Sequence, residues 1–345
     1  MNAITVRPGD AGSLRLDELP ETAPGPGEML VETLSVGVCG TDHEVLEGGI
    51  GYSPAGSDRL ILGHEALGRV IDAPAGSGLS SGDLVAPIVR RPDPVPCPNC
   101  AIGEWDMCRN GRFTEAGIRG LDGYASDMFT LPVGFGIAVE HSLGRLGILV
   151  EPASVVAKAW EHIVHIGSRA RWDPARVLVT GAGPIGLLAA LFATRHSSDV
   201  HVLDRVKEGP KPALVEDLGA TYHTGGLADI GRGVDVVLEC TGAPELVGAV
   251  MGHTGPNGVV CLTGVTSAGR QMVTSDLARE LVLENDTVFG TVNANRRHYQ
   301  EAARVLAETD HSWLERLINR RVPLTRWEEA YEREPNDVKT VIEFR

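Results

Sequence analysis

The sequence predicts two domains: an α/β domain with a doubly wound parallel sheet, and a mainly antiparallel, β-barrel-like domain. Three observations support this fold class. Short apolar runs alternate with helical segments over residues 171–290, a glycine-rich turn follows the first of these runs, and strand-like runs separated by turn signals precede them. The chain has 345 residues, enough for two domains of ordinary size.

Composition excludes several classes of function. The formal net charge of −15 argues against a nucleic-acid partner, because phosphates would be repelled. No apolar run reaches the roughly 18–20 residues that span a bilayer, and residues 1–7 lack the apolar region of a signal peptide. We therefore expect a cytoplasmic protein that binds neither membrane nor nucleic acid.

The glycine-rich turn is the centre of the predicted α/β domain. Residues 177–180 form a short β-branched run, and a helix is expected over 184–195. Between and within them lies a GxGxxG pattern, which permits a tight turn, a close approach of a pyrophosphate and close helix–strand packing. Its residues are Gly181, Gly183, Pro184, Ile185 and Gly186. The pattern predicts a dinucleotide site of the Rossmann type, and the alternative is an ordinary strand–helix turn without a ligand.

The next strand, 200–203, ends at Asp204, which lies 18 residues beyond Gly186. An acid at this place can accept hydrogen bonds from the adenosine ribose, and its charge favours NAD. Arg205 and Lys207 could instead pair with the additional phosphate of NADP, so both cofactors stay open.

The alternation continues to residue 290. Thr241 follows the strand 234–239, and ligands bind at the carboxyl ends of such strands. Further strands are expected at 258–263 and 287–290. Further helices are expected at 152–165, 210–218, 244–253, 274–283 and 298–308.

Polar residues suited to metal chemistry occur in the first half of the chain. Cys39, Thr41 and His43 follow a strand expected at 29–36, and His64-Glu65 interrupts an apolar segment. The alternatives are a buried cysteine and a hydrogen-bonded core histidine. Glu151 precedes Pro152 at an expected helix start, either as a charge favoured by the helix dipole or as a ligand.

Three of the six cysteines form a second group, Cys97-x2-Cys100-x7-Cys108. This spacing is typical of zinc sites, but a structural zinc takes four ligands. Asp93 is the nearest replacement for the missing cysteine, and the alternative is three reduced cysteines without metal. A second strand-like run at 124–131 follows this segment.

The order of these motifs resembles the zinc-dependent medium-chain alcohol dehydrogenase superfamily, and within it the glucose dehydrogenases familiar from archaea. The stretches that carry the resemblance are 37–42, 63–65, the cysteine group, Glu151-Pro152, 181–186 and 239–242, together with 39–44, 89–91, 113–118, 290–293 and 340–344. The resemblance implies a catalytic domain at 1–156 and 294–345, a Rossmann domain at 157–293, and a homodimer or homotetramer.

The resemblance also implies the site. Cys39 and His64, with one or both of Glu65 and Glu151, would bind a catalytic zinc, and the Cys97 group would bind a second, structural zinc. Thr41, Glu115, Glu151 and Asn293 would contact a sugar, and Thr241 and Asn293 would also contact NAD or NADP. Val89 stands where some members have asparagine, and Asp93 stands in place of the first zinc-binding cysteine.

The expected reaction is oxidation of an aldose, D-glucose or else D-galactose, at C1 to the aldonolactone. Zinc would act as a Lewis acid on the anomeric hydroxyl. The proton would leave through Thr41 or through water near Glu65, with His43 at the end of the relay, and the hydride would pass to NAD(P). One alternative is a zinc dehydrogenase of another polyol or alcohol, and the other is a non-catalytic nucleotide-binding relative.

Overall fold

The computed structural model describes residues 1–265 and 275–345. The chain divides into two compact units, of which unit 1 is Met1–Ser154 with Asn293–Arg345 and unit 2 is Val155–Val292. The boundaries expected from the sequence, after residue 156 and before residue 294, lie near these divisions. Unit 1 is therefore discontinuous in sequence, whereas unit 2 is continuous.

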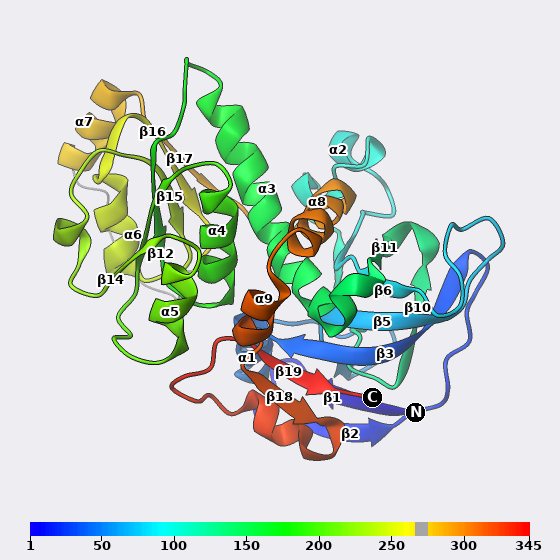
Figure 1. Cartoon of the computed structure of the whole chain (residues 1–345). Coiled ribbons are helices and arrows are strands. Elements are labelled where there is room, and N and C mark those ends of the chain that lie inside the picture. Colours follow the sequence, from blue (N-terminus) through cyan, green and yellow to red (C-terminus); the bar gives the residue numbers. More distant parts are fainter. Residues whose placement is uncertain (266–274) are drawn as a thin grey trace. The chain divides into compact units, whose positions relative to one another are not determined.

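Unit 2 is built on a six-stranded parallel sheet with the order β14-β13-β12-β15-β16-β17 (Figure 1). Its strands are β12 (Arg176–Thr180), β13 (Asp199–Leu203), β14 (Thr221–His223), β15 (Val234–Glu239), β16 (Thr254–Leu262) and β17 (Thr287–Gly290). Its helices are α4 (Pro184–Thr194), α5 (Pro210–Glu216), α6 (Pro244–Met251) and α7 (Ser275–Glu284). α3 (Val150–Gly167) begins in unit 1 and continues into unit 2.

This strand order confirms the predicted doubly wound sheet. The chain starts at β12, winds outward to β14, and returns to the other side of β12 at β15. β14, a three-residue edge strand, was not predicted. The first residue of the helix expected at 274–283 lies outside the described residues, and the remainder forms α7.

The order of strands reverses between β12 and β15, and the glycine turn lies at the end of β12. Gly181 has a φ of +87°, which favours glycine. A Cβ atom on Gly186 would collide with the carbonyl oxygen of Gly181. The glycines thus keep the start of α4 close to the end of β12, at the switch point where such sheets bind ligands.

Unit 1 contains a seven-stranded sheet with the order β11-β6-β5-β3-β19-β18, in which β10 also pairs with β3. Its strands are β3 (Glu28–Val38), β5 (Glu65–Asp72), β6 (Leu84–Pro87), β10 (Met128–Pro132), β11 (Gly136–Val139), β18 (Arg320–Pro323) and β19 (Thr340–Glu343). The described pairs are antiparallel except for β18 with β19. The predicted mainly antiparallel architecture is confirmed.

Two three-stranded sheets complete unit 1, with the orders β2-β1-β4 and β7-β8-β9. Their strands are β1 (Asn2–Val6), β2 (Arg15–Glu18), β4 (Leu60–Ile61), β7 (Arg90–Arg91), β8 (Thr114–Ala116) and β9 (Gly120–Leu121). The helices of unit 1 are α1 (Gly40–Leu46), α2 (Pro98–Ala101), α8 (Arg296–Ala307) and α9 (His311–Leu317), with 3-10 segments at Trp105–Met107, Val133–Phe135, His141–Leu149 and Leu324–Tyr331.

The strand expected at 124–131 begins only at Met128. Tyr124 and Ala125 instead donate their backbone N–H groups to the carbonyls of Gly63 and Leu62, at 2.8 and 2.9 Å. The segment before β10 thereby supports the backbone next to His64, and this local pairing replaces the expected continuous strand.

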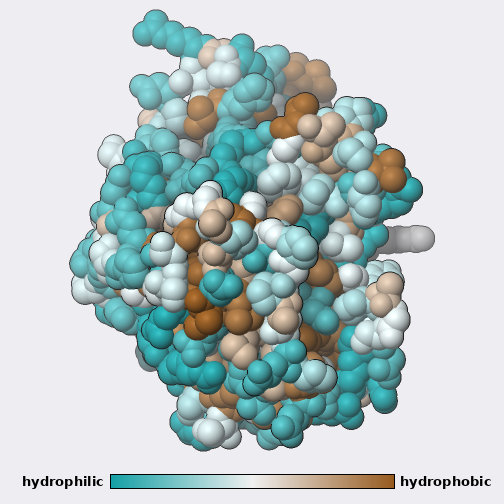
Figure 2. Space-filling view, turned by 90° about the vertical axis from the view of Figure 1, so that its right-hand side faces the viewer, coloured by the Kyte–Doolittle hydropathy of each residue, from teal (hydrophilic) through white to brown (hydrophobic). Residues whose placement is uncertain are grey.

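The face seen in Figure 2 is mostly hydrophilic, with hydrophobic side chains in smaller groups between hydrophilic ones. A core of buried apolar residues from β1, β3, β5, β10 and β19 stabilises unit 1. None of the helices that the structure describes has the length and apolar character needed to cross a membrane.

Candidate functional site

Cys39, His64 and Glu65 form a group that could hold a metal ion. Cys39 precedes the first residue of α1, and Glu65 is the first residue of β5. The antiparallel pairing of β3 with β5 places Gly37 opposite Glu65. As a result, one ligand atom from each of the three residues lies within 4.8 Å of the others.

The donor set fits zinc. Thiolate, imidazole and carboxylate are the side-chain ligands that zinc takes, and a catalytic zinc has about three of them. His64 and Glu65 are buried, with exposed fractions of 5% and 2%. Two such polar groups are costly to bury side by side unless they are paired or bind an ion.

Asp42 orients two members of this group, and the sequence analysis gave it no role. One oxygen accepts the Cys39 N–H at 2.8 Å, and the other lies 3.5 Å from His64 Nδ1. Burial disfavours a protonated His64, but Asp42 outweighs burial, so the pKa of His64 is raised well above its ordinary value. A carboxylate behind a histidine commonly orients a metal ligand. The only sequence signal for Asp42 is an acid at the third helical position, as in a capping box.

Lys339 is a second residue that the sequence analysis missed. Its side chain is buried, contacts Glu65 Oε2, and donates to the Val38 carbonyl at 3.0 Å. Burial lowers the pKa of Lys339, but the Glu65 carboxylate outweighs that effect and raises it. The pairing of Thr340 with Val38 brings Lys339 there. No local motif marks this lysine.

The other residues expected around the metal come from α1 and α3. Glu151, the second residue of α3, is buried. Burial, and then the charge of Glu65, raises the pKa of Glu151 to about 8. Thr41 and His43 are half-buried on α1, and the pKa of His43 is lowered by burial and then by Arg333. Glu151 does not belong to the metal-capable group found among the described residues.

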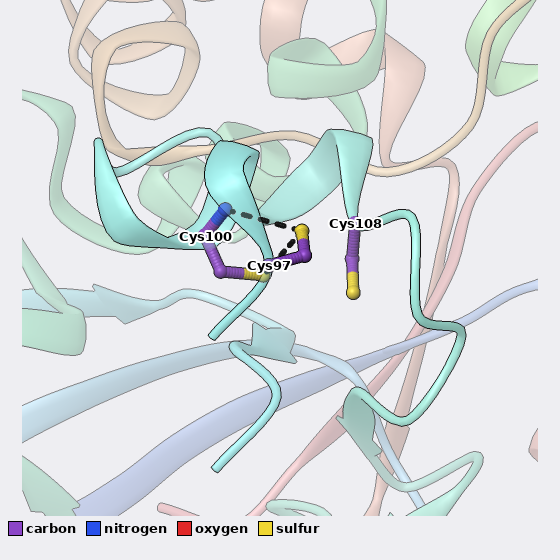
Figure 3. Close-up of side chains that lie close together, drawn as sticks. All are labelled: Cys97, Cys100 and Cys108. Atoms are coloured by element: carbon purple, nitrogen blue, oxygen red, sulfur yellow. Dashed lines mark hydrogen bonds between the residues drawn. The ribbon is translucent and has the colours of Figure 1, made fainter. Parts of the chain in front are cut away.

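Cys97, Cys100 and Cys108 form the second metal-capable group (Figure 3). The sulfur atoms of Cys97 and Cys100 are 3.6 Å apart. Backbone N–H groups of Arg109 and Cys100 point at Cys97 Sγ and lower the pKa of its thiol to about 6. Three soft thiolate donors fit zinc.

Asp93 lies outside this three-sulfur group as the structure describes it. Oδ1 accepts the Val95 N–H at 2.8 Å, and Oδ2 accepts from Asn110 and Arg112 at 2.9 and 3.1 Å. These bonds shape the loop that carries the cysteines. Asp93 would have to exchange partners to act as the fourth ligand.

Glu115 and Asn293 contact each other, although 178 positions separate them in sequence. Asn293 Nδ2 donates to Glu115 Oε1 at 2.8 Å. Asn293 has a φ of 61°, an uncommon conformation for a residue other than glycine. Arg90, which lies in the stretch 89–91 and was given no role from the sequence, also donates to Glu115. The structure thus brings these three polar side chains together in unit 1.

A pocket in unit 2 contains the residues expected to bind the dinucleotide at its adenosine end. It is lined by Gly181, Leu203, Asp204, Arg205, Val206, Lys211, Thr224, Gly225, Gly226, Leu227, Thr241, Ala243, Glu245, Leu246 and Ala249. Gly183 precedes α4, Pro184 and Ile185 begin it, and Gly186 follows. The free N–H groups at this helix start suit a phosphate.

Asp204 is fixed by its neighbours at this pocket. It accepts the N–H groups of Ala182 and Val206 at 2.6 and 2.9 Å, and Lys211 Nζ lies 3.5 Å away. Burial opposes the charge of Asp204, but the two N–H groups and Lys211 together outweigh burial and lower the pKa of its carboxyl. No motif in the sequence indicates Lys211 in this pocket.

Comparison with known proteins gives the family. The family described as "Glucose dehydrogenase C-terminus" matches residues 144–344, and "Alcohol dehydrogenase GroES-like domain" matches residues 25–140. The chain is 38% identical to a glucose 1-dehydrogenase of Methanocella arvoryzae, over 100% of this chain and 99% of the relative. The chain belongs to the glucose dehydrogenase family.

Further members support this membership. A glucose 1-dehydrogenase of Thermoproteus tenax is 40% identical over the full length of both chains. The structure of Haloferax mediterranei glucose dehydrogenase in complex with NADP, Zn and gluconolactone has a TM-score of 0.93 and 35% identity, over 100% of this chain and 99% of that one. The predicted resemblance to zinc-dependent glucose dehydrogenases is confirmed.

Proposed function

We propose that this protein is an NAD(P)-dependent glucose 1-dehydrogenase that oxidises an aldose at C1 to the aldonolactone. The observation that carries the proposal is the metal-capable group of Cys39, His64 and Glu65 in a chain that aligns over its full length with glucose 1-dehydrogenases. D-Glucose is the first candidate substrate and D-galactose the second.

Cys39, His64 and Glu65 would hold the catalytic zinc, with Glu151 as a further candidate ligand. Zinc bound there would supply a Lewis acid that polarises the anomeric hydroxyl. Asp42 orients His64 and the backbone of Cys39, and Lys339 fixes one oxygen of Glu65. These contacts fix the positions of the donor atoms before the metal binds. Less conformational entropy is therefore lost when the metal is bound.

Other residues would bind the sugar and carry its proton. Glu115 and Asn293 offer a carboxylate and an amide, which suit a substrate with many hydroxyls. Thr41 Oγ1, or a water beside Glu65, would take the proton of the C1 hydroxyl, and His43 would end the relay. Bound NAD(P) supplies the hydride acceptor.

The dinucleotide would lie along the glycine turn, with Asp204 at the adenosine ribose and Arg205 and Lys211 beside it. The charge of Asp204 favours NAD, whereas the positive charges of Arg205 and Lys211 could pair with the additional phosphate of NADP. Thr241 at the carboxyl end of β15 would complete this site, and Asn293 would also contact the cofactor.

Three further proposals accompany this function. A second zinc would bind to Cys97, Cys100 and Cys108, with Asp93 as the fourth ligand. The enzyme would work in the cytoplasm as a homodimer or homotetramer, the assembly that the family resemblance implies. Light scattering coupled to size-exclusion chromatography tests the assembly.

The deciding experiment measures the reduction of NAD and of NADP with glucose, galactose, xylose and ethanol, before and after chelation. Turnover of an aldose that disappears with the chelator and returns with zinc supports the proposal. Activity confined to ethanol or a polyol would assign another substrate class. Binding of the nucleotide without turnover would indicate a non-catalytic relative.

A further inference from the structure

We infer that Arg90 is a positioning residue for substrate recognition, because it sets the direction in which Glu115 faces the sugar. The inference rests on the proposed function, in which Glu115 binds a substrate hydroxyl. In this role Arg90 takes no part in proton transfer and acts on the substrate only through the side chain of Glu115.

Three N–H donors converge on a single oxygen of Glu115. Arg90 Nε and Nη2 lie 3.1 and 2.9 Å from Oε1, and Asn293 Nδ2 lies 2.8 Å from the same atom. An ionised carboxylate offers about four acceptor positions on two oxygens. Because Oε1 is occupied, Oε2 becomes the acceptor that a sugar hydroxyl can use.

Arg90 is itself held from three directions. Strand pairing places it directly opposite Glu115 in the β7–β8 ladder. Its Nη1 donates to the Asp106 carbonyl at 2.8 Å, and its guanidinium lies 3.8 Å from the centre of the Phe113 ring. A planar guanidinium can stack and donate in two directions at once, which a lysine ammonium cannot do.

The buried ion pair between Arg90 and Glu115 contributes little to the stability of the fold. The exposed fractions of the Arg90 and Glu115 side chains are only 7% and 13%. Desolvation largely cancels the attraction of such buried pairs, so they add little net stability. A fixed carboxylate, in contrast, improves discrimination, because a site built to bond a hydroxyl rejects substrates that lack it.

The asparagine supports the same arrangement from the other side. Asn293 Oδ1 accepts the N–H of Ala294 at 2.8 Å, which fixes the orientation of its amide. Its Nδ2 group therefore points at Glu115 Oε1 and not away from it. Arg90 and Asn293 together leave the carboxylate little rotational freedom.

The test compares Arg90→Lys with the matched control Arg91→Lys. Arg91 also lies over an aromatic ring, Phe135, and donates to Tyr124 at 3.0 Å, but has no contact with Glu115 among the described hydrogen bonds. In Arg90→Lys we expect the KM for glucose to rise about tenfold or more, the scale of a lost charged hydrogen bond. We expect kcat, the KM for NAD(P), zinc content and melting temperature to change little, and the control to keep its KM for glucose.

Two further measurements separate positioning from a general structural role. In a Glu115→Gln background, Arg90→Lys should add much less to KM than it does alone, since the two residues act as one unit. Across a series of monodeoxyglucoses, the wild type should penalise the loss of one hydroxyl strongly, and Arg90→Lys should reduce that penalty.

An unchanged KM in Arg90→Lys, or equal effects in both backgrounds, would overturn the inference and leave the proposed function standing. A parallel loss of kcat, nucleotide affinity and melting temperature would also overturn it, by indicating only a structural role. If the wild type oxidises a polyol in place of an aldose, the proposed function fails, and the same comparison on that polyol still decides the role of Arg90. If the wild type oxidises neither an aldose nor a polyol, both the proposed function and the inference about Arg90 fail.

Discussion

At the scale of single residues, the site depends on side chains that hold other side chains. The side chains of Asp42, Lys339 and Arg90 contact those of His64, Glu65 and Glu115, respectively. Local motifs indicate His64 and Glu65, because ligand types and spacings are local in sequence, whereas the family resemblance implies Glu115. Lys339 is brought to Glu65 by the pairing of β19 with β3, and Arg90 is brought to Glu115 by the pairing of β7 with β8. Local sequence patterns do not specify these pairings.

The first prediction concerns His64. Replacing it with alanine removes the imidazole from the metal-capable group, so we expect His64→Ala to lose aldose oxidation and the catalytic zinc. Elemental analysis and circular dichroism should show less zinc in a protein that is still folded. Full activity in this variant would contradict the assignment of the zinc site.

The second prediction concerns Gly37, which has no room for a side chain. A Cβ atom there would collide with the Glu65 carboxylate and would lie 2.9 Å from Lys339 Cε. We expect Gly37→Ala to weaken zinc binding and to lower the free energy of unfolding by about 1–3 kcal/mol, as overpacked sites do.

Gly134→Ala is the control for Gly37, because a Cβ atom at Gly134 would meet nothing within 4 Å. Urea unfolding and a zinc competition assay compare the two variants. Equal behaviour of both would show that the close packing around Gly37 is not what the zinc site requires.

At the scale of elements, the sequence predicted the long regular parts best. The strands around the glycine turn and the helices of unit 2 were found because apolar runs and helix formers alternate there. β14 was missed because three residues, Thr221–His223, are too few to show a periodicity. The strand expected from Tyr124 was wrong at its start because the backbone pairs with Leu62 and Gly63 instead.

The third prediction concerns the pairing of β13 with β14. His201 Nδ1 and His223 Nε2 are 2.9 Å apart, so one ring must donate and the other accept. Burial and then His201 lower the pKa of His223 below 6.5, although Asp229 opposes this, and Asp199 lies 3.0 Å from His201 Nε2. Below pH 6.5, position 223 therefore binds more protons in the unfolded chain than in the folded one, so the contribution of His223 to the free energy of unfolding should fall as the pH falls further.

His223→Asn should reduce this loss, whereas the exposed His165→Asn should not. Urea unfolding at a series of pH values from about 8 to about 5 measures the slopes. Parallel slopes in the wild type and His223→Asn would show that the pair does not contribute.

The fourth prediction concerns the cysteine segment. If it holds a zinc, Cys100→Ser should lower the zinc content by one ion per chain, because one of three sulfur donors is removed. Asp93→Asn should keep the ion at saturating zinc but release it faster to a chelator. An unchanged zinc content in Cys100→Ser would mean that no metal binds there.

At the scale of the whole molecule, the two-domain organisation followed from the change in pattern along the chain. Strand–helix alternation marks unit 2, and it stops where unit 1 resumes after residue 292. The pattern does not show that the last residues pair with β3, because that contact joins positions more than 300 residues apart, as the Lys339–Val38 bond illustrates with a separation of 301. Resemblance to a family implied only that residues 294–345 belong to the same domain as residues 1–156.

The fifth prediction tests this long-range connection. β19 lies between β3 and β18 in the main sheet, and its removal would leave both strands with an unpaired edge. Deletion of residues 340–345 should therefore unfold unit 1 and abolish zinc binding, while unit 2 keeps its protease resistance. Limited proteolysis with mass spectrometry identifies the protected fragment, and resistance throughout unit 1 would contradict the prediction.

The position of β19 also sets an order of events on the ribosome. Residues 1–154 emerge before β19, so the edge of β3 that pairs with β19 stays unpaired until residues 340–343 have been made. Unit 2 is complete well before that point, and domains fold as they emerge. The nascent protein thus carries an open sheet edge, a known site of aggregation, between the synthesis of β3 and that of β19. When Lys339 and β19 emerge from the ribosome, β19 can pair with β3 and close that edge. The same step brings Lys339 to Glu65.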